Sequence, residues 1–88
     1  MWGISLSEKA LKFLERNHLQ KEDVFALVGG TIKKFSGEDI NVDIKKLKGE
    51  WFGFYRIRKG KLRIIAEFNF DNHHAFIEAV DWRGGAYK

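Results

Sequence analysis

The residues best suited to chemistry in this sequence are arginines and lysines gathered in one short block. Residues 45–63 contain eight Lys/Arg and a single acidic residue, Glu50, whereas the chain on either side has a small excess of acidic residues. Three of the eight are Arg56, Arg58 and Arg63, and the planar, permanently charged guanidinium group binds phosphate oxygens well. A localised basic block predicts a site for a polyanion. The alternative is a solvated, charged hairpin that binds nothing.

Lysines and aromatic residues near the arginines could widen such a site. Bases of single-stranded nucleic acid stack on aromatic rings, and lysines add salt-dependent affinity for the phosphate backbone. For Phe52 and Phe54 we favour a place in a second layer of the core, and for Trp82 a core position is an equal alternative. The expected nucleic-acid-binding rim comprises Lys45, Lys46, Lys48, Lys59, Lys61 and Trp82.

The same region could support cleavage of RNA without a metal, with the 2′-OH as nucleophile. That reaction needs a proton acceptor, positive charge to stabilise the phosphorane and a proton donor for the leaving 5′-oxygen. Arginine meets the second need but is a poor base, because its guanidinium stays protonated at physiological pH. Tyr87 could donate a proton, accept one or stack on a base. Strand alternation places Glu67 and Glu78 nearby, although pairing with Arg63 or Arg56 is the simpler role for both.

The histidines offer a weaker alternative, a metal site. His73 and His74 are adjacent, and His18 could be a third ligand. Neighbouring side chains of an extended segment point in opposite directions, so adjacent histidines rarely bind one ion. We therefore predict no metal site and place His73 and His74 in a turn.

The elements that position these residues follow from hydrophobic periodicity. Ser7 is a suitable N-cap, and the pair Gly29–Gly30 inside a helix predicts a kink or a close approach by another element. Lys59–Gly60 predicts a turn between two strands. We expect a strand from Trp2 to Leu6, helices over about 8–17 and 21–35, an edge segment near Val42 and Ile44, and strands over 51–58, 61–70 and about 74–82.

Alternation along the strands predicts which face each side chain occupies. One face of the middle strand should be core, made by Leu62, Ile64, Ala66, Phe68 and Phe70. With Tyr55 and Ile57 also inside, Arg56 and Arg58 lie beside Arg63 on the opposite, polar face. Glu78 and Trp82 are expected to share a face. The helices would cover the apolar face and leave the arginines exposed.

Composition limits the class of protein. A chain of 88 residues is expected to form one domain, and its eight Phe and three Trp can supply the large side chains that a small core needs. The absence of Cys excludes a disulfide scaffold and thiolate metal sites. No apolar run approaches the roughly 20 residues of a membrane span. A cytoplasmic location is the expectation.

Several of these residues also form a recognisable pattern. The segment Leu47–Lys48–Gly49, then Trp51, then the run from Tyr55 to Ile65, resembles the RelE/ParE toxin superfamily, with the RelE-like branch favoured. The tail from Trp82 to Tyr87 is similar to the closing Arg-then-Tyr motif of that superfamily, and Ser7 to Leu14 resembles its first helix. The resemblance implies one α+β domain over residues 1–88. Its fold would be an N-terminal strand, a helical hairpin and a curved, mainly antiparallel sheet of three to four strands.

The resemblance also implies an activity and a set of roles. RelE-like members are toxins of type II toxin–antitoxin systems that cut mRNA on the ribosome without metal or cofactor. A cognate antitoxin blocks the toxin, and the complex of the two commonly binds operator DNA. By position, Arg63 matches the hairpin arginine, Arg83 the C-terminal arginine and Tyr87 the terminal tyrosine. The implied catalytic set is Arg56, Arg58, Arg63, Arg83 and Tyr87.

This sequence departs from the RelE-like pattern in its acid–base groups. Arg56 and Arg58 stand where many members have lysine, and Trp82 stands where some have histidine. Gly84–Gly85 replaces residues that are often charged. Without an evident general base, two alternatives stay open. One is a ParE-like toxin that poisons DNA gyrase without cutting nucleic acid, and the other is a degenerate, non-toxic binding module.

Overall fold

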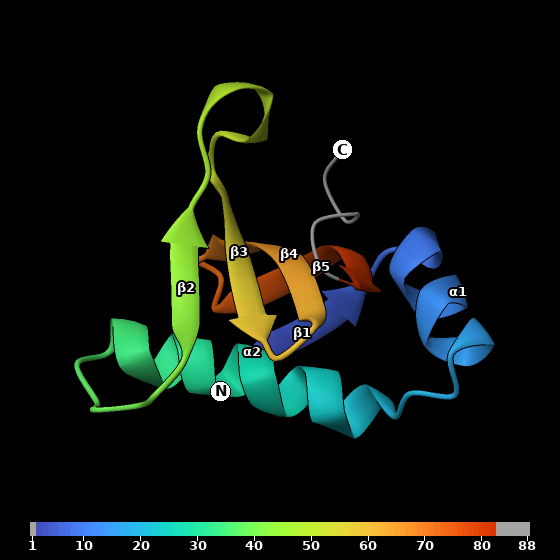
Figure 1. The fold of residues 1–88 in the computed structure, drawn as a ribbon. Helices are drawn as coiled ribbons and strands as arrows, with labels where there is room; N and C mark the ends of the chain where they lie inside the picture. Colours follow the sequence, from blue (N-terminus) through green and yellow to red (C-terminus); the bar gives the residue numbers. More distant parts are fainter. Residues whose placement is uncertain (1, 83–88) are drawn as a thin grey trace.

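The computed structural model describes residues 2–82, which form two α-helices, a short 3₁₀ helix and a mixed five-stranded sheet. The strands lie in the order β1-β5-β4-β3-β2, with β1 parallel to β5 and every other pair antiparallel (Figure 1). The predicted α+β class is confirmed. The elements are β1 (Gly3–Leu6), α1 (Glu8–Arg16), α2 (Lys21–Phe35), β2 (Asp43–Lys46), η1 (Gly49–Trp51), β3 (Phe54–Lys59), β4 (Leu62–Asn69) and β5 (His74–Trp82).

Local signals in the sequence account for the limits of α1. The Ser7 side chain accepts a hydrogen bond from the backbone N–H of Ala10 at 3.0 Å, and Glu8 lies in the first turn, where it complements the helix dipole. The helix ends because His18 adopts a left-handed conformation with φ 55°. Asn17 supports this end through its side-chain amide, which donates to the carbonyl of Phe13 at 2.8 Å. The predicted helix over 8–17 is confirmed to within one residue.

The glycine pair in α2 has a packing neighbour at one of its two positions. A Cβ at Gly30 would lie 3.4 Å from Val42 Cγ2 and 3.5 Å from Ile40 Cγ2, so the segment before β2 approaches the helix closely there. A Cβ at Gly29 would meet no atom of the described residues within 4 Å. The segment before β2 therefore packs against α2 at Gly30, in line with one of the two predicted alternatives, but a Cβ there would make ordinary van der Waals contacts, so the packing does not require glycine.

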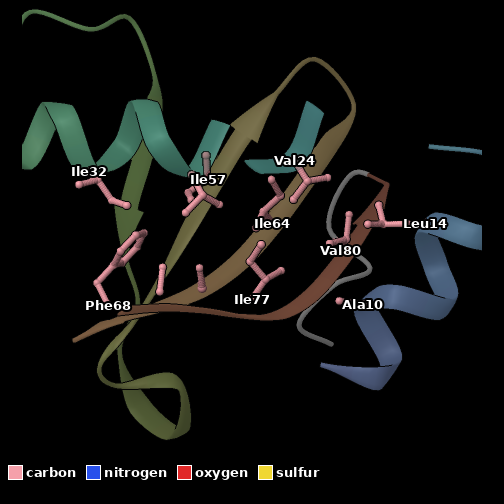
Figure 2. Packing of buried hydrophobic residues seen from close by; sticks show 12 residues of the cluster. Ala10, Leu14, Val24, Ile32, Ile57, Ile64, Phe68, Ile77 and Val80 are labelled. Carbon is pink, nitrogen blue, oxygen red and sulfur yellow. The ribbon is translucent and has the colours of Figure 1, made fainter. Parts of the chain in front are cut away.

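The main core lies between the helices and one face of the sheet. Val24, Val28 and Ile32 of α2 join Ala10 and Leu14 of α1 in this core. In Figure 2 these side chains meet those of the strands, which include Ile57, Ile64, Phe68, Ile77 and Val80. The predicted apolar alternation is confirmed, and Tyr55 and Ile57 lie inside as expected. Phe70 differs, because β4 ends at Asn69 and leaves the Phe70 ring 50% exposed beside Trp2.

The sequence predicted a strand from residue 51, and this start is wrong, because the connection between β2 and β3 extends to Gly53. Residues Gly49–Trp51 form η1, and Gly53 has a φ of 94°, a conformation that favours glycine, so the strand begins only at Phe54. The connection projects away from α2 in Figure 1. Phe54 lies in a second apolar layer as predicted, whereas Phe52 is 76% exposed, which contradicts a core position.

A second, smaller core lies on the sheet face that the helices leave uncovered. Ile65 and Ala79 are buried there under Leu47, with Trp51 and Phe54 packed around them. The face predicted to be polar is therefore polar only in part, because the β2–β3 connection covers one patch of it.

A β-bulge changes the alternation in β5. Ile65 pairs with Ala79 but Ala66 pairs with Ile77, so Glu78 is an extra residue between two ladder positions. As a result Glu78 lies near Trp51 and Phe54 on the uncovered face, while Trp82 packs on Phe13 of α1. The expectation that Glu78 and Trp82 share a face is wrong. No helix within residues 2–82 is long and apolar enough to cross a membrane.

Candidate nucleic-acid interface

The uncovered face of the sheet brings charged side chains from four strands into one row. Asp43 of β2 pairs with Arg58 of β3, Arg58 with Arg63 of β4, and Arg63 with Asp81 of β5. Directly paired residues of neighbouring strands point to the same side of a sheet. The next row along the strands places Lys45 beside Arg56, followed by Ile65 and Ala79. Arg56, Arg58 and Arg63 therefore share one face, as the alternation predicted.

Asp43 binds two of these three arginines. Its Oδ1 accepts from Nη2 of Arg56 at 3.1 Å, and its Oδ2 pairs with Nη2 of Arg58. The sequence pointed instead to Glu67 and Glu78 as carboxylate partners, whereas in the structure the carboxylate that pairs with Arg56 and Arg58 is that of Asp43. The signal for it was its place in the predicted edge segment, between Val42 and Ile44, which sends its side chain to the opposite face. The arginine pair is thus partly neutralised rather than free.

Arg56 and Arg58 differ in how firmly they are held. The Arg56 side chain is 15% exposed and that of Arg58 is 47% exposed. Arg56 Nε is buried and has no hydrogen-bond partner within residues 2–82. Burying a guanidinium donor without a partner is costly, so the packing around Arg56 holds its side chain in place. Asp43 thus pairs with one largely buried cation, Arg56, and one half-exposed cation, Arg58.

Arg63 is directed toward the β3–β4 turn. Its Nη1 donates to the carbonyl of Gly60 at 2.7 Å and to that of Leu62 at 3.2 Å. Gly60 has a φ of 59°, which confirms the turn predicted from Lys59–Gly60. The guanidinium is held at the end of the hairpin, next to the position of Arg58.

The lysines of the predicted rim are all exposed but do not form one surface. Lys45 shares the face of Arg56. Lys46 and Lys59 pair with Tyr55 and Leu62, so they point to the helix-covered side of the sheet. Lys48 precedes η1, and Lys61 lies in the β3–β4 turn.

Trp82 lies apart from the arginine row. Its ring packs on Phe13 with centroids 5.6 Å apart, and its Nε1 donates to Asn17 Oδ1 at 3.1 Å. It is still 41% exposed. Arg83 and Tyr87, the other two residues of the predicted catalytic set, lie outside the described residues.

A hollow between α1 and the end of β5 holds basic residues that the sequence analysis did not select. Lys9, Lys12 and Arg16 line it together with Glu8, which pairs with Lys12 at 3.0 Å, and Asp81, which neighbours Arg63 across the strands. These three lie outside the basic block, and only their spacing on one helix face indicates that they act together. With Glu8 paired to Lys12, the hollow keeps a small excess of positive charge at the end of β5.

The histidines have structural partners. His74 Nε2 is 2.9 Å from Ser5 Oγ across the β1–β5 pair, and the His73 ring lies 5.5 Å from that of Trp2. His73 has a φ of 51° and sits in the predicted turn, whereas His74, also predicted there, is the first residue of β5. Within residues 2–82 no three His, Asp or Glu side chains are grouped closely enough to hold a metal ion.

The chemistry available on this face is electrostatic. The guanidinium groups can bind phosphate oxygens and stabilise negative charge that develops on them. Among the carboxylates of the face, Asp43 is engaged by two cations, and Glu67 is exposed at the other end of β4. Glu78 lies beside Trp51 and Phe54, and Asp81, the neighbour of Arg63, accepts from the backbone N–H of Trp82 at 2.7 Å. The described residues therefore supply phosphate binding more clearly than proton transfer.

A scan of protein-family models finds no match to this sequence, and a search of curated proteins finds none either. Solved structures do match. A YafQ mutant from E. coli has a TM-score of 0.69 at 13% identity and covers 100% of both chains. The RelBE2 toxin–antitoxin complex from Mycobacterium tuberculosis has a TM-score of 0.63 at 23% identity and covers 93% of this chain and 91% of that one.

A third similar structure is the RelB–RelE antitoxin–toxin complex from Methanococcus jannaschii. It has a TM-score of 0.58 at 25% identity and covers 88% of this chain and 87% of that chain. All three comparisons extend over most of both chains, so the whole described architecture is shared. The chain has the fold of the RelE-like toxins, as the resemblance of its sequence implied.

Proposed function

We propose that this chain, which has the fold of the RelE-like toxins, is the toxin of a type II toxin–antitoxin system. It acts in the cytoplasm as a ribosome-dependent mRNA endonuclease and is kept inactive by a cognate antitoxin. The observation that carries the proposal is the placement of Arg56, Arg58 and Arg63 on one uncovered sheet face, from two adjacent strands. Fold similarity alone does not imply an activity, whereas clustered guanidinium groups give this face the means to bind phosphate oxygens.

The proposed reaction needs no metal or cofactor. The 2′-oxygen of the RNA forms a bond to the adjacent phosphorus, and the bond from phosphorus to the 5′-oxygen breaks, which leaves a 2′,3′-cyclic phosphate and a 5′-OH. The arginines of the sheet face and Arg83 stabilise the phosphorane. Tyr87 stacks on the nucleotide or protonates the leaving 5′-oxygen. The ribosome orients the RNA and provides the acceptor for the 2′-OH proton, which this chain lacks an evident group to supply.

A protein antitoxin is the expected partner. Two of the similar structures are complexes of a toxin with an antitoxin. The basic row and the basic hollow beside α1 would suit a partner segment with acidic residues, and covering either would block access of RNA. Binding to operator DNA is proposed only for the complex with the antitoxin.

Mapping of transcript ends after a brief pulse of expression tests the activity. New 5′ ends inside translated frames, absent with Arg63→Ala and with Arg83→Ala, are the expected result. The controls must be folded, which circular dichroism of the purified proteins checks. Growth arrest with intact transcripts and DNA breaks would favour a gyrase poison instead, and normal growth with intact transcripts would favour a non-toxic binding module.

A further inference from the structure

We propose that Asp43 is an internal ligand of the phosphate site. Its carboxylate occupies the position between Arg56 and Arg58 that a phosphate group of the nucleic acid takes, and it leaves that position when the ligand binds. The inference rests on the proposed function in one respect, the use of this face to bind RNA. It adds a residue that neither the basic composition nor the fold assigns to the site.

The geometry of the contacts is that of a bound oxyanion. One carboxylate oxygen of Asp43 accepts from Arg56 at 3.1 Å and the other pairs with Arg58. The two guanidinium groups thus converge on two oxygens that share one central atom. A phosphodiester presents the same arrangement with its two non-bridging oxygens. The carboxylate therefore marks where a phosphate can sit.

Burial shows which partner can move. The Asp43 side chain is 39% exposed, and the residue begins β2, the edge strand of the sheet. The Arg56 side chain is 15% exposed and is held by packing. Rotation of Asp43 into solvent leaves the Arg56 guanidinium in place. The Asp43 side of both ion pairs is open to solvent, which weakens them, so a phosphate can displace this carboxylate.

The negative charge of Asp43 affects how strongly the neighbouring arginines attract an anion. Asp43 offsets one of the two positive charges of Arg56 and Arg58, and this weakens attraction for any single anion. A ligand that also contacts Arg63 and Lys45 gains from several phosphates at once and still displaces the carboxylate. Asp43 thus raises the threshold for binding of any anion at this position, and a polyanion overcomes it through its additional contacts.

The experiment measures binding by the purified chain. Asp43→Asn removes the charge with little change in shape, and Asp71→Asn makes the same charge change in the turn after β4, at the opposite end of that strand from Arg63. The probes are inorganic pyrophosphate, followed through the ¹⁵N signals of the arginine side chains, and a short single-stranded RNA, followed by fluorescence anisotropy. Thermal melting confirms that each variant is folded.

Asp43→Asn should bind both probes about three- to fivefold more tightly than wild type, and Asp71→Asn should change binding less than twofold, as expected for the loss of one weak ion pair. Asp43→Glu, which keeps the carboxylate, should bind like wild type. Equal or weaker binding by Asp43→Asn than by Asp71→Asn would overturn the proposal, as would the absence of binding by wild type and variant alike.

A second measurement keeps the test valid if Asp43→Asn fails to fold. In the wild-type protein, pyrophosphate should shift the ¹³C signal of the Asp43 carboxylate and leave that of Asp71 unchanged. No shift would overturn displacement. Because these readouts are binding and not cleavage, a protein that binds as described but leaves transcripts intact would retain this inference and lose the proposed nuclease activity.

Discussion

The two faces of the sheet are formed by the same strands but carry different kinds of side chain. On the covered face, Ile57, Ile64 and Ile77 are fully buried against two helices and form a continuous core. On the uncovered face, only the patch around Ile65 and Ala79 is buried, and it adjoins a row of charged residues. The buried apolar side chains are therefore concentrated on one face, and the arginines that we propose bind phosphate lie on the other. Substitutions should affect folding or function according to the face they alter.

The small core on the uncovered face contributes to stability and also lies directly beside the arginines. Ile65 is the cross-strand neighbour of Arg56, and it is covered by Leu47 and Trp51 from the β2–β3 connection. This packing holds the strands in register beneath the arginines. It also orders the connection, so that Phe52 projects from a fixed turn.

The largest expected effect is from a charge placed in the main core. Phe68 is buried and its ring contacts those of Trp2, Phe35 and Tyr55. Phe68→Asp should unfold the chain, because it buries an unpaired carboxylate and removes a large apolar side chain. Loss of the far-ultraviolet circular dichroism spectrum checks this. Asn69→Asp, which adds the same charge at an exposed neighbouring position, is the control, and a folded Phe68→Asp protein would reverse the assignment of the faces.

The next prediction compares two adjacent, fully buried isoleucines on opposite faces. Ile64→Ala should lower the free energy of unfolding by about 3–4 kcal/mol, because the helices above it cannot close the cavity. Ile65→Ala should cost about 2 kcal/mol, because the connection that covers Ile65 can move toward the sheet. Urea unfolding of both variants measures the difference. A larger loss for Ile65→Ala would show that the small core contributes more to stability than its size suggests.

The elements of the covered face could be predicted from the sequence because each has a local signal. Alternation from Leu62 to Phe68 identified the core strand, and Ser7 identified the start of α1. The glycine pair in α2 indicated a kink or a close approach, and the segment before β2 packs against the helix at Gly30. These features depend on residues near one another in the chain, so their periodicity is visible in the sequence.

What the sequence did not reveal depends on pairing between distant segments. The ion pairs of Asp43 require the register of β2 against β3, and the sequence placed that acid only in an uncertain edge segment. The bulge at Glu78 changes the faces of the residues after it, so alternation alone misplaced Trp82. Phe52 was expected in a core because its neighbours are apolar, but Gly49 and Gly53 form a turn that points it outward.

Arg56→Met is expected to change stability less than the core substitutions do, but to abolish RNA binding. Arg56→Met keeps the volume of the side chain and removes a buried cation whose Nε has no hydrogen-bond partner within the described residues. Asp43 retains Arg58 as a partner. Arg56 is largely buried whereas its partner Asp43 is partly exposed. Replacement of a buried ionic group by an apolar side chain of similar volume is often neutral for stability, so the free energy of unfolding should change by less than about 1 kcal/mol. RNA binding and growth arrest should be lost.

Urea unfolding together with RNA anisotropy separates the two outcomes for Arg56→Met. Arg56→Lys is the matched variant, since it keeps the charge but loses the planar donor group, and it should retain part of the binding. A stable Arg56→Met protein with unchanged RNA binding would remove Arg56 from the site. A strongly destabilised one would assign it a structural role.

The smallest effect on folding is expected at the tip of the β2–β3 connection. Phe52 is 76% exposed, so Phe52→Ala should change the free energy of unfolding by less than about 0.5 kcal/mol. Phe54→Ala, two residues along, should cost about 2–3 kcal/mol, because Phe54 packs edge-on against Trp51 at 5.4 Å and covers the small core. Urea unfolding compares the two. If Phe52→Ala weakens binding of single-stranded RNA while the fold is unchanged, the exposed ring contacts a base. An equal loss of unfolding free energy for Phe52→Ala and Phe54→Ala would instead show that the turn packs against the sheet through Phe52.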